Sequence, residues 1–366
     1  MKIKCLKSDL INGINIVNRA IPNKTTMNIL ENILITVEGN CIKLTASDME
    51  LGIETIIDGT ILEGGNIALE SKLFSEIIRK LPESDILIET DSNYMTSITC
   101  ENSEFNISGK SGEEFPPLPD YEKTNPLVIS QLSLRDLITK TIFSISDNES
   151  NKTMTGELFE INNNNFKVVS LDGHRVSIRN VDLKDVYDNK KVIVPGKTLN
   201  EITKIIASDA NKDVNIYFND KNIIFEFDNT IVISRLIEGE YFKIDQMFSN
   251  NCDVKVTLNK KEFLDCIDRA TIYIKDGEKK PVKLNFADDN LEVSISSQIG
   301  SMNADIAIEK DGKDLEIGFN PKFLIDALKA IDDENITVYM INSKAPCFIQ
   351  NETKSYVYLI LPVNYN

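Results

Sequence analysis

The chain has 366 residues, 42% of them hydrophobic and 27% charged, which predicts a globular protein of two to four domains because a domain usually holds about 100–200 residues. No apolar run approaches the roughly 18 residues that cross a bilayer, the N-terminus lacks the apolar part of an export signal, and the six cysteines stand singly. We therefore expect a cytoplasmic protein with no membrane segment, metal site or cofactor, and the net charge of −17, taken alone, argues against a nucleic-acid partner.

One structural unit is repeated three times along the chain, and each copy begins with an amphipathic helix. These helices are predicted over 8–21, 132–145 and 260–274. Apolar residues recur three and four positions apart, which puts them on one helix face that must be buried. They are Leu10, Ile14, Val17 and Ile21 in the first copy, Phe263, Ile267, Ala270 and Ile274 in the third and, less regularly, Ile138, Ile142 and Ile145 in the second.

Alternating strand patterns follow each opening helix. Glu38-Gly39-Asn40, the Asn162–Asn165 run and Asp288-Asp289-Asn290 interrupt these patterns and predict hairpin turns. Each copy thus reads helix, strands, helix, strands, which predicts an α+β fold with antiparallel sheet. A charged, proline-containing linker near 112–126 and a break near Ser249 divide the chain into predicted domains 1–124, 125–249 and 250–366.

A second helix in each copy begins near Ser71, Gly196 and Asn320 and leads directly into a strand. Adding 125 to a residue number moves from one copy to the next. The apolar face of these helices comprises Phe74, Leu199 and Leu324, then Ile77, Ile202 and Ala327, then Leu81, Ile206 and Ile331. Their spacings of three, four and seven put them on one side, which predicts burial against the sheet.

Basic residues occupy the opposite side of the second helices. Two equivalent sets lie seven residues, or two helical turns, apart: Lys72, Lys197 and Lys322, and Arg79, Lys204 and Lys329. A single basic pair is typical of an ordinary solvated helix face. Three pairs in one register, in a protein this acidic, favour a functional basic surface.

The sequence contains no phosphate-binding loop, dinucleotide-binding turn, zinc-protease helix or nucleophile elbow. One cluster could be catalytic, at Ser170–Arg175, but Asp172 lies only two residues from His174 and need not orient it. We expect a turn instead, in which Asp172-Gly173 supplies the unusual backbone and His174-Arg175 opens onto a surface. No catalytic residue is therefore predicted.

These residues resemble one family. SLDGHRVS (Ser170–Ser177), the C-terminal YLILPVN (Tyr358–Asn364) and three α+β repeats of this length resemble the bacterial DNA polymerase III beta subunit, the sliding clamp. The resemblance covers essentially the whole chain. Shorter stretches add to it: KTTMNILENIL (24–34), RKLPES (79–84), GEEFPPLPDY (112–121), TGELFE (155–160) and RLIEGEY (235–241).

The resemblance implies three repeated domains of the DNA-clamp type, each with two helices packed on antiparallel sheet, which form half of a closed ring. Two chains would close this ring head to tail, with helices lining a hole through which duplex DNA passes, so that the clamp holds the replicative polymerase on DNA. Basic helix faces would then contact phosphates without reading sequence. The implied contacts are Lys24, which matches a position that is basic in relatives, and Lys72, Arg79, Lys197, Lys204, Lys322 and Lys329.

The resemblance also implies a hydrophobic pocket for short peptides of the DNA polymerase III alpha subunit, the clamp loader and other clamp-motif proteins. The implied wall is Met154, Leu171, Gly173, His174, Arg175 and Val176 from the second domain with Leu359, Leu361, Pro362 and Val363 from the C-terminal tail. Asn364 stands where many relatives have arginine, and Met247-Phe248-Ser249 lacks a proline that is frequent there. The alternative is that the tail is only a last strand that completes the third sheet.

For the homodimer, the resemblance implies an interface of Phe105 and Ile107 in one chain with Ile272 and Tyr273 in the other. Pairing would cover exposed strand edges, which otherwise promote aggregation. Gln131-Leu132-Ser133-Leu134 resembles the peptides that clamps bind, but it leads into a predicted helix, and we interpret it as structural.

Three functions are compatible with these observations. The first is a DNA sliding clamp with no catalytic site of its own. The second is a repeat-built interaction scaffold with no DNA in its hole. The third is a hydrolase that uses Asp172, His174 and a remote partner.

Overall fold

The structure, a computed structural model, describes residues 1–247, 252–275, 278 and 280–364. By residue contacts the chain divides into two compact units, one comprising Met1–Leu134 and Glu201–Leu236 and the other Arg135–Asn200 and Ile237–Asn366. Because residues of the predicted middle domain belong to both units, this division is not the predicted one. The boundaries near 124 and 249 therefore stay predictions.

All six predicted helices are present within the described ranges. They are α1 (Lys7–Val17), α2 (Ser71–Lys80), α3 (Gln131–Thr139), α4 (Gly196–Ile205), α5 (Lys260–Ala270) and α6 (Pro321–Lys329). The apolar face predicted for the second helices α2, α4 and α6 is confirmed, since all nine of its residues are buried. In α1 and α5 the predicted faces are also buried up to Val17 and Ala270.

The opening helices end earlier than the periodicity predicts. Each gives way to a short 3₁₀ helix: η1 (Asn18–Ala20), η4 (Ile142–Ser144) and η7 (Thr271–Tyr273). The expected core residues beyond these points (Ile21, Ile142, Ile145 and Ile274) are only half-buried. For α3 and α5 the physical reason is local, because short polar side chains bond to the helix backbone: Thr141 donates to Leu137 O at 2.6 Å and Thr271 to Asp268 O at 2.6 Å.

Two of the second helices, α2 and α6, begin at side-chain caps. Glu70 accepts from the backbone N–H groups of Lys72 and Leu73 at the start of α2. Asn320 accepts from Lys322 N at 3.0 Å at the start of α6, where Pro321 occupies the first turn. Such caps are each worth about 1 kcal/mol. They fix the register in which the basic residues of these helices face away from the core.

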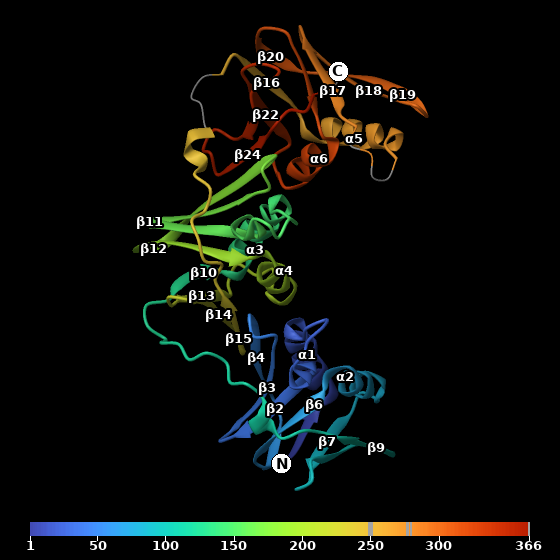
Figure 1. The fold of residues 1–366 in the computed structure, drawn as a ribbon, viewed down its shortest axis with the longest axis vertical. Helices are drawn as coiled ribbons and strands as arrows, with labels where there is room; N and C mark the ends of the chain where they lie inside the picture. Colours follow the sequence, from blue (N-terminus) through green and yellow to red (C-terminus); the bar gives the residue numbers. More distant parts are fainter. Residues whose placement is uncertain (248–251, 276–277, 279, 365–366) are drawn as a thin grey trace. The chain divides into compact units, whose positions relative to one another are not determined.

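The first unit contains two antiparallel sheets (Figure 1). A five-stranded sheet has the order β5-β1-β7-β8-β9, with β1 at Lys2–Leu6, β5 at Thr60–Glu63, β7 at Asp85–Thr90, β8 at Met95–Cys100 and β9 at Ser103–Ser108. An eight-stranded sheet has the order β10-β13-β14-β15-β4-β3-β2-β6, with β2 at Asn32–Glu38, β3 at Cys41–Ser47, β4 at Leu51–Ile57, β6 at Gly65–Glu70, β10 at Leu127–Ser130, β13 at Asp213–Phe218, β14 at Asn222–Phe227 and β15 at Thr230–Arg235. Helix α1 packs on α2 and on β3 and β4.

The second unit also contains two antiparallel sheets. A seven-stranded sheet has the order β11-β12-β24-β23-β22-β16-β20, with β11 at Gly156–Leu171, β12 at Arg175–Pro195, β16 at Val254–Asn259, β20 at Glu309–Gly312, β22 at Asn335–Met340, β23 at Cys347–Gln350 and β24 at Tyr356–Ile360. A four-stranded sheet has the order β19-β18-β17-β21, with β17 at Val282–Ala287, β18 at Asn290–Ser297, β19 at Gly300–Ala307 and β21 at Leu315–Phe319. In both units the helices lie on one side of the sheets (Figure 1).

Two of the three predicted hairpin turns lie between strands, and the third lies inside a strand. Gly39 and Asp288 have left-handed backbone, with φ of 57° and 50°, at the connections β2–β3 and β17–β18, as those hairpins need. The Asn162–Asn165 run lies inside β11, where Asn163 has φ of 55° and the register of pairing with β12 shifts on both sides. Asparagine tolerates this conformation better than most residues, so the run marks an irregular point of β11.

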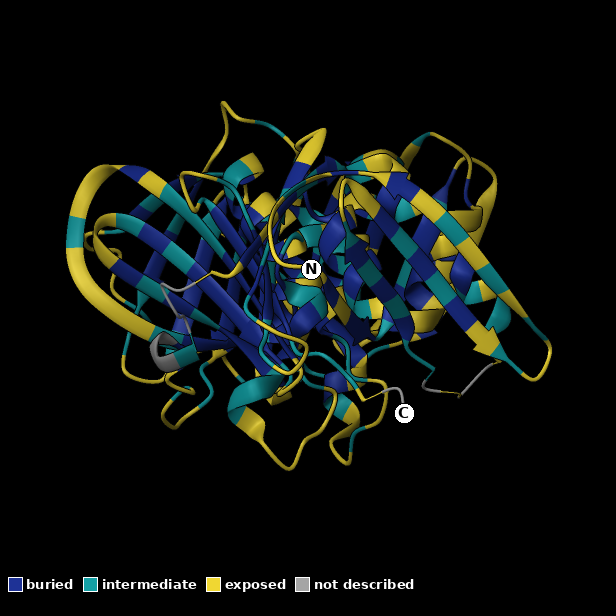
Figure 2. Cartoon of the chain, turned by 90° about the horizontal axis from the view of Figure 1, so that it is seen from above, coloured by how far each residue is buried: buried dark blue, intermediate teal, exposed yellow. Residues whose placement is uncertain are grey.

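Burial alternates along the strands, as a sheet with one covered face requires (Figure 2). In β17, Val282, Leu284 and Phe286 are buried and the residues between them are half-buried. No helix in the described ranges is long and apolar enough to span a membrane. The fold is thus α+β, with antiparallel sheets that bury one face against helices and leave the opposite helix surfaces exposed.

Candidate functional site

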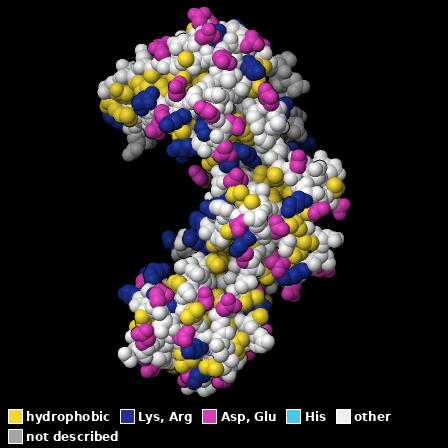
Figure 3. Space-filling view, turned by 180° about the vertical axis from the view of Figure 1, so that it is seen from behind, with side chains coloured by type: hydrophobic (Ala, Val, Ile, Leu, Met, Phe, Trp, Pro, Cys, Tyr) yellow, Lys and Arg dark blue, Asp and Glu magenta, His cyan; other side chains and the backbone are white. Residues whose placement is uncertain are grey.

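The first candidate surface is the basic side of α2, α4 and α6. Lys72, Arg79, Lys197, Lys204, Lys322 and Lys329 are all exposed, as is Lys24 in the loop before β2. Lys204 pairs with Glu201 of its own helix at 2.7 Å. Figure 3 shows acidic side chains spread over the face that it draws, whereas many Lys and Arg side chains gather along the helix-bearing side of each unit.

The second candidate site is built on the turn between β11 and β12. Asp172 Oδ1 accepts from the backbone N–H groups of His174 at 2.9 Å and Arg175 at 3.1 Å. Gly173 has φ of 88°, which lies in the left-handed region that glycine adopts without strain. The prediction that Asp172-Gly173 supplies the unusual backbone is therefore confirmed.

Arg175 does not open onto a surface as predicted, because its side chain is only 7% exposed. Its guanidinium donates to Asp172 Oδ2 at 3.0 Å, to Asp326 Oδ2 at 2.7 Å and to the Phe143 carbonyl. It also lies 4.5 Å from the Phe323 ring centroid. Two carboxylates and an aromatic face thus compensate the buried charge and hold the turn in one conformation.

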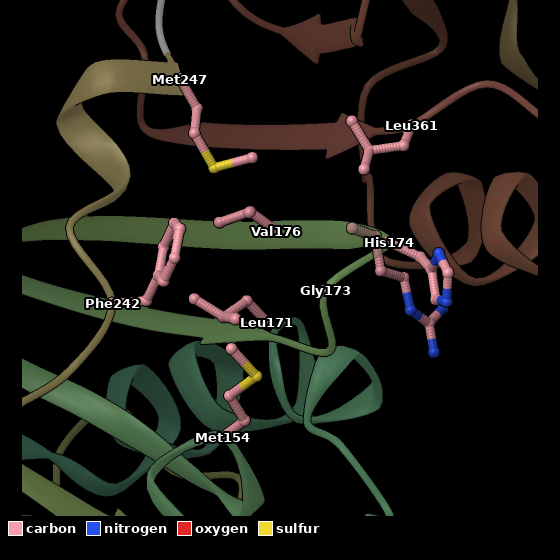
Figure 4. A pocket seen from close by; sticks show the side chains of 9 residues that line it. Met154, Leu171, Gly173, His174, Val176, Phe242, Met247 and Leu361 are labelled. Carbon is pink, nitrogen blue, oxygen red and sulfur yellow. The ribbon is translucent and has the colours of Figure 1, made fainter. Parts of the chain in front are cut away.

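An apolar pocket of about 210 Å³ opens beside this turn (Figure 4). Its lining is Met154, Leu171, Gly173, His174, Arg175, Val176, Phe242, Met247 and Leu361. Figure 4 shows Met154 and Met247 pointing toward the space from opposite sides, with Phe242 at one end and Leu361 at the other. The volume is below the roughly 300–1,000 Å³ of small-molecule sites and suits one or two apolar side chains of a peptide.

Seven of the ten predicted pocket residues line this space, and three do not. Leu359 is fully buried in the core cluster beneath the pocket, where it pairs with Val176 across β12 and β24. Pro362 and Val363 follow the end of β24, and Val363 N donates to Gly318 O at 2.9 Å, which holds the tail against β21. Leu361 is the first residue after β24 and packs on the same cluster as Leu359, at the open side where the pocket lies.

The sequence reasoning missed Phe242 and Met247 as lining residues. Met247 is the last residue of η6 (Ile244–Met247), and Phe242 directly follows the stretch RLIEGEY. The signal for Phe242 is that a large aromatic residue lies in the connection between β15 and β16, where it is 52% exposed. Phe248 and Ser249, where the missing proline was noted, lie outside the described residues.

Asp172 and His174 are arranged for structure and not for proton transfer. Both Asp172 oxygens accept from the turn's own backbone and from Arg175, while the His174 ring stacks on Phe323 with centroids 6.1 Å apart. Among the described residues, no group of three or more His, Cys, Asp or Glu could hold a metal ion. In this geometry the Asp172 carboxylate is engaged by the turn and by Arg175, and the His174 ring is oriented by Phe323.

The predicted interface residues lie at two sheet edges. Phe105 and Ile107 are on β9, the edge strand of the five-stranded sheet; Phe105 is 38% exposed and Ile107 is buried. Ile272 is 72% exposed, and Tyr273 packs against the core below the four-stranded sheet, whose edge strand is β19. Gln131 and Leu134 are buried in α3, which confirms the structural interpretation of the segment 131–134.

A buried carboxyl provides a test of the fold around the pocket. Glu157 on β11 is fully buried, and among the described residues neither carboxyl oxygen has a hydrogen-bond partner. Burial raises the pKa of Glu157 well above its ordinary value of 4.5. Burial also raises the pKa of Tyr241, which packs on the core beneath the pocket, and the negative charge that Glu157 could carry adds to that rise.

We expect Glu157→Gln to stabilise the protein increasingly as pH rises. A raised folded-state pKa means that the folded chain keeps a proton that the unfolded chain releases above about pH 4.5. The wild type therefore loses about 1.4 kcal/mol of stability per pH unit from that point up to the pKa of the folded state. The side-chain amide of the variant has no such proton. Urea unfolding at pH 4, 6 and 8 measures the difference, and a difference that stays constant with pH would contradict the assignment.

The chain is similar throughout its length to known proteins of one family. The N-terminal, central and C-terminal domains of the DNA polymerase III beta subunit match residues 1–119, 128–243 and 245–364. Beta sliding clamps of Staphylococcus epidermidis and Staphylococcus aureus are each 34% identical over 374 residues, with 99% of both chains covered.

Solved structures agree with these matches. A chain from Eubacterium rectale assigned to the DNA polymerase III beta subunit is 60% identical, with a TM-score of 0.98 and 100% of both chains covered. The DNA polymerase sliding clamp of Bacillus subtilis is 30% identical, with a TM-score of 0.97, and covers 100% of this chain and 99% of its own.

Proposed function

The chain belongs to the bacterial DNA polymerase III beta subunit family, the beta sliding clamps, and from this membership we propose that two copies close around duplex DNA and hold the replicative polymerase on it. The observation that carries the DNA contact is the register of the exposed basic pairs on α2, α4 and α6. Each pair lies opposite a buried apolar face. Because the apolar face of each helix is buried, its basic face is directed away from the sheets and is open to a ligand.

Phosphate is the chemistry that such faces fit. Lys and Arg neutralise phosphates without reading bases, so the ring would bind any sequence and could move along it. The proposed contacts are Lys24, Lys72, Arg79, Lys197, Lys204, Lys322 and Lys329. The excess of acidic residues elsewhere would discourage DNA from binding outside the hole.

The homodimer would form through the edge strands β9 of one copy and β19 of the other, with Phe105, Ile107, Ile272 and Tyr273 at the contact. Both strands end their sheets, so each presents unpaired backbone groups that a second strand can satisfy. Antiparallel pairing of this kind would join the two sheets into one.

The apolar pocket beside the β11–β12 turn would receive short peptides of the DNA polymerase III alpha subunit, the clamp loader and other clamp-motif proteins. Met154 and Met247 suit this use, because unbranched side chains can repack around different ligands. The proposed wall is the observed lining, with Leu359, Pro362 and Val363 in supporting positions. As an accessory subunit the chain would have no catalytic site of its own, and it would act in the cytoplasm, where the chromosome is replicated.

The alternative of a scaffold without DNA is not favoured, because the curated relatives are sliding clamps. Two measurements on the wild-type protein test the proposal. After loading, it should stay on a closed circular duplex and leave when the circle is cut, and its mass in solution should be that of two chains. Equal retention on closed and linear DNA, or a stable monomer, would overturn the proposal.

A further inference from the structure

The three 3₁₀ helices η1, η4 and η7 occupy equivalent places after the opening helices, and their middle residues differ in chemistry. These residues are Arg19, Phe143 and Ile272. In the first two copies the middle residue contributes to a joint between successive copies within the chain. The third copy has no following copy within the chain, so the two joints show which contacts its equivalent residues leave unmade.

The first joint lies inside the first unit. Arg19 Nη1 is 3.4 Å from Glu201 Oε2 on α4, and beside it β4 of the first copy pairs with β15 of the second. Glu201 is largely shielded, with 19% of its side chain exposed. The middle residue of η1 therefore meets the second helix of the next copy through an ion pair.

The second joint lies inside the second unit and uses the same places. The Phe143 carbonyl accepts from Arg175, whose guanidinium stacks on Phe323 and pairs with Asp326 of α6. His174, at the tip of the β11–β12 turn, also stacks on Phe323. Arg175 and His174 thus cover Phe323 of the next copy's second helix, the carbonyl of the middle residue of η4 holds Arg175 there, and β12 pairs with β24.

The offset of 125 shows which residues occupy these positions in each second helix. Phe323 corresponds to Leu73, and Glu201 and Asp326 correspond to Glu76. In the third copy, the tip of the β18–β19 hairpin carries Ile299 where the second has His174. Ile272, Ile299 and Leu73 are 72%, 53% and 46% exposed.

We infer that a second copy of the chain completes a third joint, in which Ile272 and Ile299 of one copy enclose Leu73 of the other and Ile272 lies beside Glu76. This inference rests on the proposed homodimer and names residues on α2 that the predicted interface does not include. Both joints within the chain hold an arginine–carboxylate pair. The third has an isoleucine in place of Arg19 and Gly300 in place of Arg175, so neither position supplies a cation to Glu76 and the contact with Leu73 is apolar.

Opposite charges at Ile272 test this arrangement. Ile272→Arg should reproduce the pair of Arg19 with Glu201, keep the dimer and make its dissociation constant rise with salt. Ile272→Glu should place a like charge against Glu76 and raise the dissociation constant at least about 100-fold. Analytical ultracentrifugation at 50 and 500 mM NaCl measures both variants. The substitution Val186→Glu is the matched control, since Val186 is 74% exposed on β12, and it should leave the dimer unchanged.

Charge exchange and the reciprocal site keep the test independent of folding. Glu76→Arg added to Ile272→Glu should restore the dimer, and Leu73→Asp should weaken it as Ile272→Glu does. A wild-type protein that is monomeric would overturn the proposed homodimer and this joint with it. A wild-type dimer in which Ile272→Arg and Ile272→Glu have equal effects would overturn only the joint.

Discussion

Replacing Lys72, Lys197 and Lys322 together by glutamate should abolish retention of the protein on closed circular DNA. Each residue begins a basic pair on an exposed helix face, and a dimer would lose six cations and gain six anions. The logarithm of the DNA-binding constant falls with the logarithm of the salt concentration, and each lost phosphate contact makes this slope less steep by about 0.9. Six lost contacts make it less steep by about 5. We expect the affinity for DNA to fall at least about 1,000-fold at low salt.

The control must change the net charge equally at places away from the second helices. Lys184 on β12, Lys221 between β13 and β14 and Lys344 between β22 and β23 are all exposed. Their triple replacement by glutamate should leave retention within about threefold of the wild type, measured by gel filtration of the loaded circle. If the helix variant loads and is retained as well as the control, these helix faces do not contact DNA.

The helix faces could be predicted from sequence because they depend on spacing alone. Phe74, Leu199 and Leu324 recur in one register, and burial of that face leaves the lysines opposite it exposed. The ends of α1, α3 and α5 could not be predicted in this way. At α3 and α5 they depend on bonds of Thr141 and Thr271 to the helix backbone, which compete with the apolar period.

The pocket could be predicted only where its wall is continuous in sequence. Leu171–Val176 forms one turn, so its residues enter the site together. Phe242 and Met247 reach the same space from a separate connection. Arg175 is buried against Asp326, which lies 151 residues away in the sequence. No local pattern encodes such a contact. Long-range contacts of this kind decide which side chains face a pocket and which support it.

Replacing Leu361 by aspartate should abolish peptide binding while leaving DNA retention unchanged. Leu361 closes one end of the apolar pocket and belongs to the cluster of Leu171 and Val176. Loss of a contact with a leucine side chain costs about 1.5–3 kcal/mol, and a carboxylate in an apolar space costs more, so we expect affinity to fall at least about 100-fold. Fluorescence anisotropy of a labelled synthetic peptide containing Gln-Leu-Ser-Leu measures the change.

Leu62→Asp is the matched control, because Leu62 is 56% exposed on β5 and lies outside the pocket lining. Because β5 belongs to the five-stranded sheet of the first unit, the tail should keep its path along β21 and the peptide affinity should stay within about threefold of the wild type. Leu361→Met should also bind, since methionine keeps the apolar volume. Equal peptide affinities of Leu361→Asp and Leu62→Asp would mean that the peptide binds elsewhere and that the tail serves only to complete the sheet. Retention of Leu361→Asp on circular DNA, measured in the same preparation, separates loss of the pocket from loss of the fold.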